Sequence, residues 1–402
     1  MGCSRLFMNH GSLVNKSNNN TKRMIIGFDA KRAFQNYTGL GNYSRMLICG
    51  LAQEHQDVRA FLYAPKMTGD YKTYFSSYAN ISTHQPSGFD RYLPNLWRLF
   101  GIPMHLTGDK VQVYHGLSHE LPHGIPRNIK RVVTMHDLIV WRYPQYYKKF
   151  DCFVHRMKMK YSCKSADVVV AISEQTKRDL MDMMNVPEEK IRVIYQSCDP
   201  IFWRPIPSED IADIRQLYHL PEKYFICVGT IEERKNQMAA VQALAELPKD
   251  YHLVIVGRPR THYYVDLQNE IKRLKLNDRV QIISKADFED FPGLYASAIA
   301  SVYVSHFEGF GIPILESMCC DVPVITSNVS SMPEAGGDAA LYVNPEDPHE
   351  IAEKMKQLID NPALRENMIG KGRKQREKFT QKVIIDQFYG LYNSLIGEQD
   401  ED

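Results

Sequence analysis

The sequence predicts an α/β protein with two doubly wound, Rossmann-like domains that face a central cleft. Short apolar segments typical of buried strands alternate with helical patterns in two consecutive runs. A stretch with three prolines, residues 199–207, separates the runs and is typical of a linker. Open parallel sheets bind ligands at the carboxyl ends of their strands, so we expect function in the turns that follow the strands.

The composition is that of an ordinary globular protein, and it excludes several classes. The chain has 402 residues, of which 44% are apolar and 24% charged, and 49 basic against 47 acidic residues give a net charge of +2. We therefore expect roughly two or three domains and no nucleic-acid partner. No apolar run approaches the ~20 residues of a membrane helix. The eight cysteines lack metal-ligand spacing, so we expect reduced thiols and a cytoplasmic location.

The two runs and their flanks predict five segments. They are a disordered tail over 1–23, an N-terminal Rossmann-like domain over 24–200, a linker over 201–220, a C-terminal Rossmann-like domain over 221–378, and a C-terminal helix and tail over 379–402. We expect the C-terminal helix to cross back to the N-terminal domain. The tail is polar and patternless, and it lacks the apolar core of a secretory signal.

The N-terminal run begins with a strand over 24–29, a glycine turn and a helical pattern from Ser44. Gly39 and Gly41 lie in the turn, in a Gly-x-Gly spacing that lacks the third glycine of a dinucleotide site. Two interpretations stay open: the turn packs a helix tightly on a strand, or its amides face a diphosphate or the reacting sugar. Further strands are expected over 58–63, 111–116, 131–137, 167–173 and 191–195.

Two histidines, His115 and His136, stand at the carboxyl ends of expected strands in this run. A histidine at such a strand end is well placed to meet a ligand. For His136, which Asp137 follows, we favour a role in the site over core packing. For His115 both interpretations stay open.

The stretch 146–166 is basic and helical, with aromatic and aliphatic residues at helical spacing between its lysines. It predicts a solvated face on a domain helix. The alternative is contact with an anionic membrane or with a phosphorylated lipid acceptor.

The C-terminal run has expected strands over 224–229, 252–257, 280–283, 300–304 and 322–326. A charged turn follows the first of them and contains Arg234 and Lys235. Adjacent Arg and Lys at a strand end would neutralise a bound diphosphate. The arginine would make bidentate hydrogen bonds to it, and the lysine would contribute a compact positive charge. A plain solvent-facing loop is the alternative, given the neighbouring glutamates.

The most informative stretch is 305–316, which joins a strand to a helix through two glycines and Pro313. The N–H groups of a helix start favour an anion, and proline suits the first helical positions. Glu308 in the loop and Glu316 in the first helical turn would repel an anion unless they accept hydrogen bonds from sugar hydroxyls. The stretch therefore predicts either a plain strand–turn–helix connection or a site for a ligand with phosphate and sugar.

Taken together, these segments resemble a retaining GT-B glycosyltransferase of the GT4 group, close to its bacterial mannosyltransferase-like members. The resemblance runs from residue 24 to the C-terminus. Its most specific part is the pair Glu308 and Glu316, with seven residues between them, within 306–316. The supporting motifs lie at 37–43, 135–138, 228–236 and 331–340.

The resemblance implies that the C-terminal domain binds a nucleotide-diphospho-sugar donor. It places Glu316 at the ribose hydroxyls and Glu308 at hydroxyls of the donor sugar. Other implied donor contacts are the amides of Phe310, Gly311 and Ile312, with Gly229 at the strand end, and the surroundings of Gly257 and Ile283, which should border the base.

The resemblance also implies roles around the leaving group. Lys235 matches a lysine that stabilises the leaving diphosphate. The family often has an arginine directly after the strand's glycine, where this chain has Thr230, and Arg234 adjoins the lysine instead. The resemblance leaves open whether Arg234 takes the whole phosphate role. Gly39 and Gly41 match a loop that closes over the donor. His136 matches a histidine near the transferred sugar, in an N-terminal domain that binds the acceptor.

The function implied is transfer of a sugar, with mannose favoured, from a nucleotide-diphospho-sugar, with GDP-mannose favoured. The acceptor would be a saccharide or lipid-linked glycan in surface polysaccharide or lipopolysaccharide synthesis, and the enzyme could touch the inner membrane face. Lys235, Arg234 and a helix start can stabilise the leaving charge, so we expect no metal and no cofactor. The alternatives are a nucleotide-sugar epimerase on the same fold, a noncatalytic partner subunit, and a UDP-sugar donor. Either front-face substitution or double displacement through Glu308 is compatible with the sequence.

Overall fold

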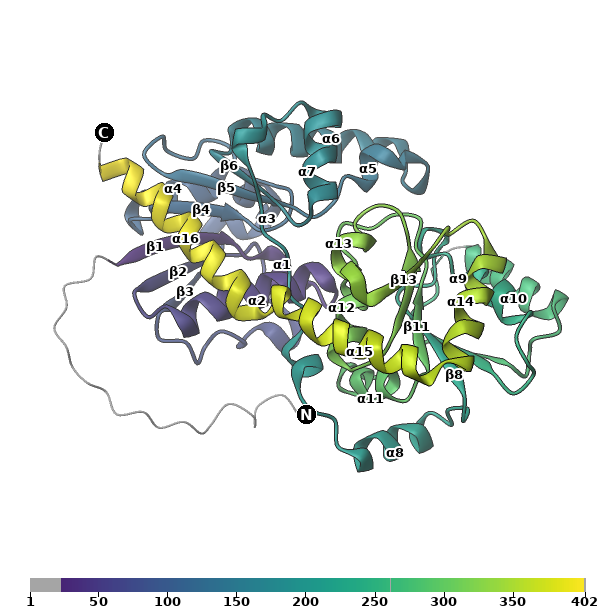
Figure 1. Cartoon of the computed structure of the whole chain (residues 1–402). Helices are drawn as coiled ribbons and strands as arrows, with labels where there is room; N and C mark the ends of the chain where they lie inside the picture. The colour runs from purple at the N-terminus through teal and green to yellow at the C-terminus, as the bar shows by residue number, and fades with distance from the viewer. Residues whose placement is uncertain (1–22, 261, 401–402) are drawn as a thin grey trace, which may run out of the picture.

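The computed structural model of the protein describes residues 23–260 and 262–400. Two parallel sheets lie in two lobes, which we call the N-terminal and the C-terminal lobe (Figure 1). The tail expected to be disordered, 1–23, lies outside the described residues except for Arg23.

The N-terminal lobe is built on a seven-stranded sheet of order β3-β2-β1-β4-β5-β6-β7. Its strands are β1 (Met24–Asp29), β2 (Val58–Tyr63), β3 (Ile81–His84), β4 (Val113–Gly116), β5 (Lys130–Met135), β6 (Val168–Ala171) and β7 (Ile191–Val193). The C-terminal lobe has a six-stranded sheet of order β10-β9-β8-β11-β12-β13. Its strands are β8 (Tyr224–Val228), β9 (His252–Val256), β10 (Val280–Ile283), β11 (Ala300–Tyr303), β12 (Val324–Ser327) and β13 (Ala340–Val343).

Helices cover both sheets (Figure 1). Those of the N-terminal half are α1 (Lys31–Gln35), α2 (Gly39–Glu54), α3 (Pro94–Leu96), α4 (Ile102–Gly108), α5 (Ile139–Arg142), α6 (Lys149–Ser165) and α7 (Glu174–Met184). Those of the C-terminal half are α8 (Ser208–Leu217), α9 (Gln237–Leu244), α10 (Tyr263–Arg273), α11 (Phe291–Ala296), α12 (Ile312–Cys319), α13 (Met332–Gly336), α14 (Pro348–Asp360), α15 (Pro362–Arg376) and α16 (Gln381–Asp400).

Both sheets are parallel throughout the described strands, which fixes where their carboxyl ends lie. The central strands are apolar on both faces because helices cover both faces; β6 (Val-Val-Val-Ala) and β8 (Tyr-Phe-Ile-Cys-Val) are buried at every residue. The carboxyl ends of β5 in one lobe and of β8 and β11 in the other carry the residues singled out in the sequence. This arrangement confirms the predicted pair of doubly wound, Rossmann-like lobes.

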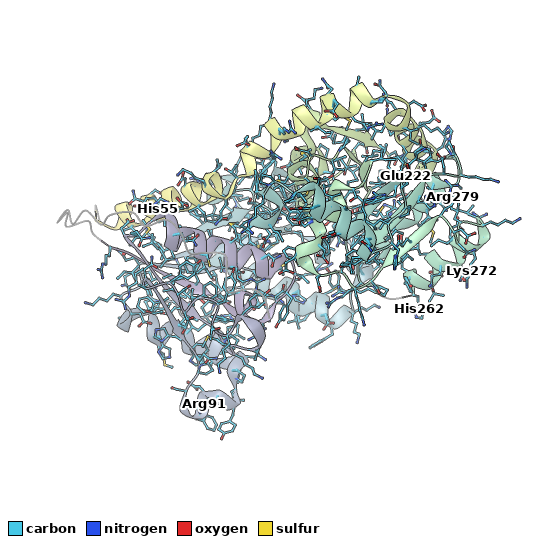
Figure 2. The ribbon with its side chains drawn as sticks, turned by 90° about the horizontal axis from the view of Figure 1, so that it is seen from below. His55, Arg91, Glu222, His262, Lys272 and Arg279 are labelled. Atoms are coloured by element: carbon cyan, nitrogen blue, oxygen red, sulfur yellow. The ribbon has the colours of Figure 1, made fainter. Side chains whose placement is uncertain are left out.

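Helix α16 crosses from the C-terminal half of the chain onto the N-terminal lobe, as predicted (Figure 1). Phe388 and Tyr392 of this helix belong to the core of the N-terminal lobe. Tyr389 stacks on His55 at the end of α2, with 3.8 Å between the ring centroids, and His55 lies beside the helix in Figure 2. The Nδ1 atom of His115 lies 2.6 Å from the Tyr392 hydroxyl.

His115 is therefore a core residue. It is fully buried, and its Nε2 atom lies 2.8 Å from the Thr134 hydroxyl. Burial lowers the pKa of His115 to about 3, so the ring is neutral. Of the two interpretations open for His115, the structure favours a packing role that fastens α16 to β4.

The structure differs from the sequence prediction at several elements. Gly39 and Gly41 do not lie in a turn before a helix; they form the first turn of α2 itself. The predicted linker over 201–220 contains helix α8, which packs on α11. Strands β3 and β13 were not predicted. The basic stretch is helical only from Lys149, because Pro144 and its neighbours form a separate turn before α6. Among the described helices, none is long and apolar enough to cross a bilayer.

Candidate active site

The centre of the candidate site is Glu308, which follows β11 and meets both cations of the charged turn after β8. Its Oε2 atom lies 2.7 Å from Nη1 of Arg234, and its Oε1 atom lies 2.6 Å from Nζ of Lys235. Glu308 is 8% exposed. Burial alone would raise the pKa of Glu308, but the charges of Lys235 and Arg234 lower it to about 2. The carboxylate is therefore ionised at neutral pH.

The two cations differ in how the fold holds them. Lys235 also donates to the Tyr303 hydroxyl, 2.6 Å away, at the end of β11. Burial lowers the pKa of Lys235 more than the pairing with Glu308 raises it. Arg234 has both arms of its fork engaged, because Nη2 lies 2.6 Å from Oε1 of Glu232. The ammonium of Lys235 has three N–H groups, and the contacts with Glu308 and Tyr303 use two of them, which leaves one for a diphosphate.

Glu316 is the second carboxylate of the site, and it lies in α12. It is the fifth residue of this helix, one turn further along than the first-turn position predicted. The Tyr295 hydroxyl donates to its Oε2 atom over 2.9 Å. Burial, which outweighs this hydrogen bond, raises the pKa of Glu316 to about 7, and the negative charge of Asp199 adds to the effect. An ionisable acceptor with such a pKa would ionise readily when a diol offers it hydrogen bonds.

The loop before α12 has the backbone geometry expected of a ligand-facing helix start. Gly311 is the N-cap residue and has φ +112°, a left-handed value that side chains oppose. With no side chain at the N-cap, the first amides of α12 receive no cap from Gly311. The Phe310 ring turns the other way, into the core against Phe379 at 5.2 Å between centroids. Phe310, Gly311 and Ile312 can therefore contribute backbone amides.

Gly309 lies at one of the places where the two lobes touch. A Cβ placed on it would lie 2.1 Å from the carbonyl oxygen of His136 in the N-terminal lobe. No side chain fits in that space. The sequence suggested that the glycines of this loop serve a turn, but at Gly309 the constraint comes from the other lobe.

His136 follows β5 and faces this contact from the N-terminal lobe. Its Nε2 atom lies 2.9 Å from the Leu117 carbonyl oxygen, which indicates that Nε2 carries the proton. Burial, with a contribution from His119, lowers the pKa of His136 to about 3, so the ring is neutral. The backbone N–H of His136 donates to Nε2 of His119 over 2.9 Å, and the Tyr43 ring packs edge-on at 4.7 Å. A neutral imidazole can orient a hydroxyl but cannot supply positive charge.

The predicted site contains further glycines, and they differ in whether the structure leaves room for a side chain. A Cβ on Gly41 would lie 1.9 Å from the Asn36 carbonyl oxygen, so this glycine packs α2 against the preceding turn. A Cβ on Gly39 would meet nothing within 4 Å. A Cβ on Gly257 would lie 1.8 Å from the carbonyl oxygen of Gly229. The ends of β8 and β9 can therefore approach each other this closely only because residue 257 has no side chain.

Ile283 packs in the core of the C-terminal lobe and is 8% exposed. Its carbonyl oxygen accepts from the Gly257 N–H over 3.0 Å. Contact between a base and this strand end would have to come from the backbone or from the residues after it.

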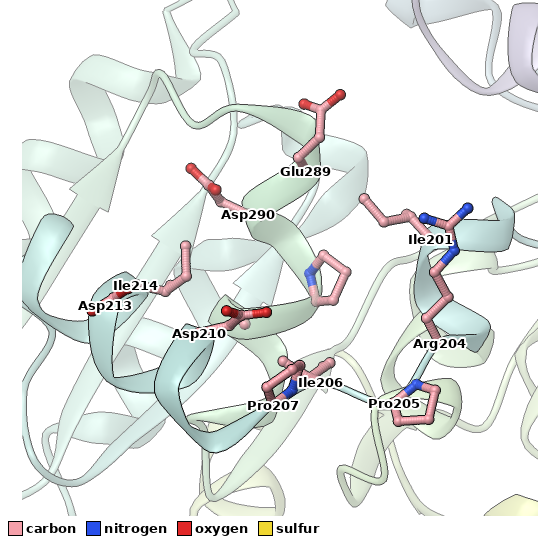
Figure 3. Close-up of a pocket in the computed structure, with 12 residues that line it drawn as sticks. Ile201, Arg204, Pro205, Ile206, Pro207, Asp210, Asp213, Ile214, Glu289 and Asp290 are labelled. Atoms are coloured by element: carbon pink, nitrogen blue, oxygen red, sulfur yellow. The ribbon is translucent and has the colours of Figure 1, made fainter. Parts of the chain in front are cut away.

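A separate cavity of about 330 Å³ lies beside the linker, away from these residues (Figure 3). Arg204 lines one side, whereas Asp210 and Asp213 of α8 and Glu289 and Asp290 line the other. Its carboxylates make it a poor place for a diphosphate. The predicted site residues lie elsewhere, at the facing strand ends.

Several residues that shape the site carried no sequence signal. Tyr295 and Tyr303 bind Glu316 and Lys235 from elements that are distant in sequence. Asp137 follows His136, and burial raises its pKa while the charge of Arg234 opposes that effect. The adjacency of Asp137 to the histidine was visible, but its proximity to the Arg234–Glu308 pair was not.

Comparisons with known proteins agree with this architecture. The model of the family described as glycosyl transferases group 1 matches residues 210–375, and that of glycosyltransferase family 4 matches residues 37–201. The O-antigen chain mannosyltransferase RfbU of Salmonella typhimurium is 30% identical over 332 residues, which cover 81% of this chain and 88% of the relative. O-antigen chain mannosyltransferase B of Escherichia coli is 28% identical over 372 residues, covering 89% and 96%.

Solved structures show the same fold. Anabaena HepE, in complex with UDP and glucose, superposes with a TM-score of 0.72 at 19% identity, covering 92% of this chain and 100% of that one. WaaG, a glycosyltransferase involved in lipopolysaccharide biosynthesis, gives 0.67 at 16% identity, covering 92% and 99%. The fold and the relatives define a glycosyltransferase of the GT-B type. The chain belongs to the GT4 family of these enzymes.

Proposed function

We propose that this glycosyltransferase transfers mannose, with retention of configuration, from GDP-mannose to a saccharide or lipid-linked glycan acceptor in surface polysaccharide synthesis. The observation that carries the proposal is the cluster of Arg234, Lys235 and Glu308 at the ends of β8 and β11, with Glu316 nearby in α12. It combines fixed positive charge for a diphosphate with two carboxylates for sugar hydroxyls.

The choice of mannose rests on the relatives. Both relatives described above are named as O-antigen mannosyltransferases, and a third, the serotype-specific mannosyltransferase WbdA of Escherichia coli, is 27% identical over 282 residues. These residues cover 66% of this chain and 34% of WbdA. These names support mannose as the sugar and polysaccharide synthesis as the process. Guanine as the base of the donor is proposed together with mannose.

The mechanism that the site favours is front-face substitution. When the bond to the anomeric carbon breaks, negative charge grows on the diphosphate oxygen, where Lys235 and Arg234 can stabilise it. The leaving phosphate then takes the proton of the acceptor hydroxyl as that oxygen bonds to the same face of the sugar. Glu308 is pinned by two cations and its pKa is about 2, which makes it a weak nucleophile and favours a role in binding hydroxyls.

The N-terminal lobe would hold the acceptor beside His136. With Nε2 committed to the Leu117 carbonyl, Nδ1 of His136 is the ring atom that can accept a hydrogen bond. The neutral ring does not compete with Lys235 for the diphosphate. No metal enters this scheme, so we propose that transfer survives treatment with EDTA.

We also propose a peripheral contact with an anionic membrane surface through α6. Phe150, Phe153 and Met157 form an exposed stripe along this helix, at 75%, 62% and 55% exposure. Exposed lysines flank the stripe: Lys148, Lys149, Lys160 and Lys164. Apolar residues between lysines are typical of a helix that lies on anionic lipid.

The donor is tested with a panel of GDP-mannose, UDP-glucose and ADP-glucose, each with and without a lipid-linked oligosaccharide acceptor, while nucleotide release is followed. The proposal expects release from GDP-mannose that needs the acceptor. Epimerisation would change the donor sugar without releasing nucleotide, and release from UDP-glucose instead would overturn the choice of base.

A further inference from the structure

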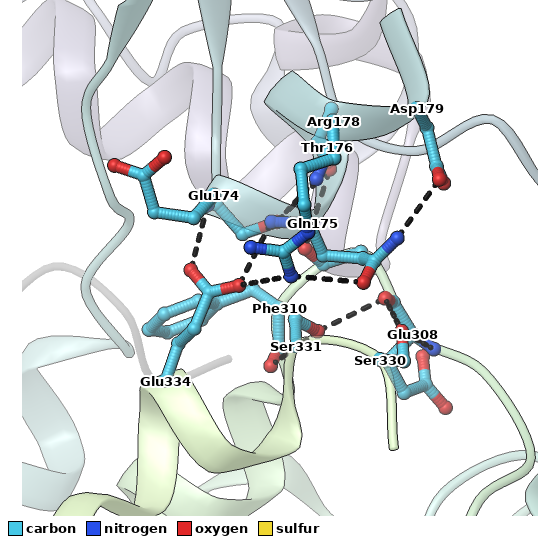
Figure 4. Close-up of polar contacts among 12 residues, drawn as sticks. Glu174, Gln175, Thr176, Arg178, Asp179, Glu308, Phe310, Ser330, Ser331 and Glu334 are labelled. Atoms are coloured by element: carbon cyan, nitrogen blue, oxygen red, sulfur yellow. Dashed lines mark hydrogen bonds and ion pairs between the residues drawn. The ribbon is translucent and has the colours of Figure 1, made fainter. Parts of the chain in front are cut away.

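The contact between the lobes includes a carboxylate of one lobe bound to the helix start of the other (Figure 4). Glu334, in α13 of the C-terminal lobe, accepts two backbone hydrogen bonds from α7 of the N-terminal lobe. The N–H of Glu174 lies 2.6 Å from its Oε2 atom, and the N–H of Gln175 lies 2.8 Å from its Oε1 atom. Both belong to the first turn of α7, whose dipole favours a negative charge.

The first turn of α7 also touches the place where the lobes meet. The Thr176 hydroxyl lies 3.3 Å from the His136 carbonyl oxygen and 3.5 Å from that of Gly309. Ser173, the N-cap of α7, fixes this residue, because its Oγ atom accepts from the Thr176 N–H over 3.0 Å. Movement of the first turn of α7 would therefore move the His136–Gly309 contact.

On the other side, α13 is joined to the loop that carries Glu308. The Ser331 hydroxyl, directly before α13, lies 2.9 Å from the carbonyl oxygens of Glu308 and Phe310. The Ser330 hydroxyl donates to the Glu308 carbonyl oxygen over 2.8 Å. Glu334 thus stands on a short element whose neighbours shape the candidate donor loop, and it reaches across to the other lobe (Figure 4).

We propose that Glu334 is a positioning residue that holds the two lobes in register for transfer, through the N-terminal amides of α7. It touches neither donor nor acceptor in this proposal. The candidate donor residues Lys235, Glu308 and Glu316 all lie in the C-terminal lobe, and His136 lies in the other. Loss of register should therefore slow transfer and leave nucleotide binding intact. The kinetic part rests on the proposed function.

The chain offers a matched pair of variants on the opposite side of the contact. Glu174→Pro removes the N–H that binds Glu334, and proline is well tolerated at the first position of a helix. Ser173 is extended, with φ −160° and ψ 161°, which suits a residue before proline. Glu174→Ala removes the same side chain and keeps the N–H. The difference between these two variants isolates the hydrogen bond.

The kinetic experiment compares Glu334→Ala, Glu174→Pro and Glu174→Ala with the wild type. We expect kcat for transfer to fall on the order of tenfold in the first two, the loss of charge-assisted hydrogen bonds being of that size. The Kd for the nucleotide that binds, GDP or UDP, should stay within about twofold of the wild-type value. Glu350→Ala is the control, because Glu350 accepts a backbone hydrogen bond from Asn344 over 2.7 Å within one lobe; it should behave as wild type.

Hydrogen exchange on the nucleotide-free protein tests the contact itself. In Glu334→Ala the amides of Glu174 and Gln175 should exchange on the order of tenfold faster than in the wild type. The proposal would be overturned if these amides stay as protected in Glu334→Ala as in the wild type. It would also be overturned if Glu174→Pro and Glu174→Ala have the same kcat, or if nucleotide binding falls as much as kcat does. If the wild type transfers no sugar, the proposed function fails while the exchange result still decides the role of Glu334.

Discussion

The side chains of Lys235 and Glu308 are joined by an ion pair of 2.6 Å between Nζ and Oε1, at the carboxyl ends of neighbouring strands. Gly229 lies beside the Lys235 side chain, with 3.8 Å from the site of a Cβ to Cε. The pair therefore stands at the strand edge where an open parallel sheet binds its ligand. Among the contacts described for Lys235, the only carboxylate is that of Glu308, and the other partner is the Tyr303 hydroxyl.

Lys235→Ala should reduce kcat for transfer by about 10²–10³-fold, because it removes a preorganised charge from the leaving diphosphate. Steady-state kinetics with GDP-mannose and acceptor measure this. The control is Lys223→Ala, which breaks an exposed pair with Asp250 in the same lobe, 2.8 Å long, and should leave kcat unchanged. A Lys235→Ala enzyme with wild-type kcat would remove Lys235 from the mechanism.

Glu308→Ala should not be rescued by azide. If Glu308 were the nucleophile of a double displacement, azide could take its place and form a glycosyl azide of inverted configuration. If Glu308 binds hydroxyls, as its ion pairs suggest, no such product forms. Mass spectrometry of the reaction with added azide distinguishes the two. Detection of the glycosyl azide would establish double displacement.

Donor binding should strengthen as the pH rises through about 7. Burial raises the pKa of Glu316 to about 7, so the free enzyme holds this carboxyl protonated at lower pH. The ionised group accepts hydrogen bonds from the ribose diol more strongly than the protonated group does, so binding weakens as the pH falls through this value. The measurement is kcat/KM for the donor on either side of pH 7. In Glu316→Gln the rise should be absent and donor binding weak throughout; an unchanged profile would assign the pH dependence to another group.

Gly309→Ala should separate nucleotide binding from transfer. Its Cβ would lie 2.1 Å from the His136 carbonyl oxygen, so the lobes must move apart. A misplacement of about 1 Å can cost about 10²-fold in rate, and we expect a loss of that order in kcat. Calorimetry should show nucleotide binding preserved, since the donor residues share one lobe. Gly370→Ala in α15, where a Cβ meets nothing within 4 Å, is the control; full activity in Gly309→Ala would refute the close interlobe contact.

Tyr392→Phe should destabilise the protein without affecting the chemistry. It removes the hydroxyl that lies 2.6 Å from Nδ1 of His115, and a buried ring nitrogen left without a partner costs about 1–3 kcal/mol. Urea unfolding measures the change in the free energy of unfolding. The rate per folded enzyme should match wild type. A selective loss of kcat at full stability would instead give His115 the functional role that the sequence left open.

The fold was largely predictable because its signals are local. The bounds of β1, β2 and β10 match the predicted strands, since each is a compact apolar run followed by a polar turn. Strand β3 (Ile-Ser-Thr-His) was missed because it is short and mostly half-buried, so it lacks an apolar run. The start of α2 was predicted too late because glycines normally indicate a turn rather than a first helical turn.

The candidate site was predictable in its residue types and less so in its contacts. Arg234, Lys235 and Glu308 were placed in one site by their positions after strands, and the structure brings them together. The tyrosine partners of Lys235 and Glu316 were not predictable, because nothing in a single sequence pairs residues tens of positions apart. The same holds for Glu334, whose partner amides lie in the other lobe.

The measurement that tests the central claim most directly is acceptor-dependent release of GDP from GDP-mannose, by wild type and Glu316→Ala, with the anomeric configuration of the product read by NMR. The account predicts release only with acceptor, a product that keeps the configuration of the donor, and no transfer by Glu316→Ala. A product of inverted configuration, or full activity in Glu316→Ala, would contradict it.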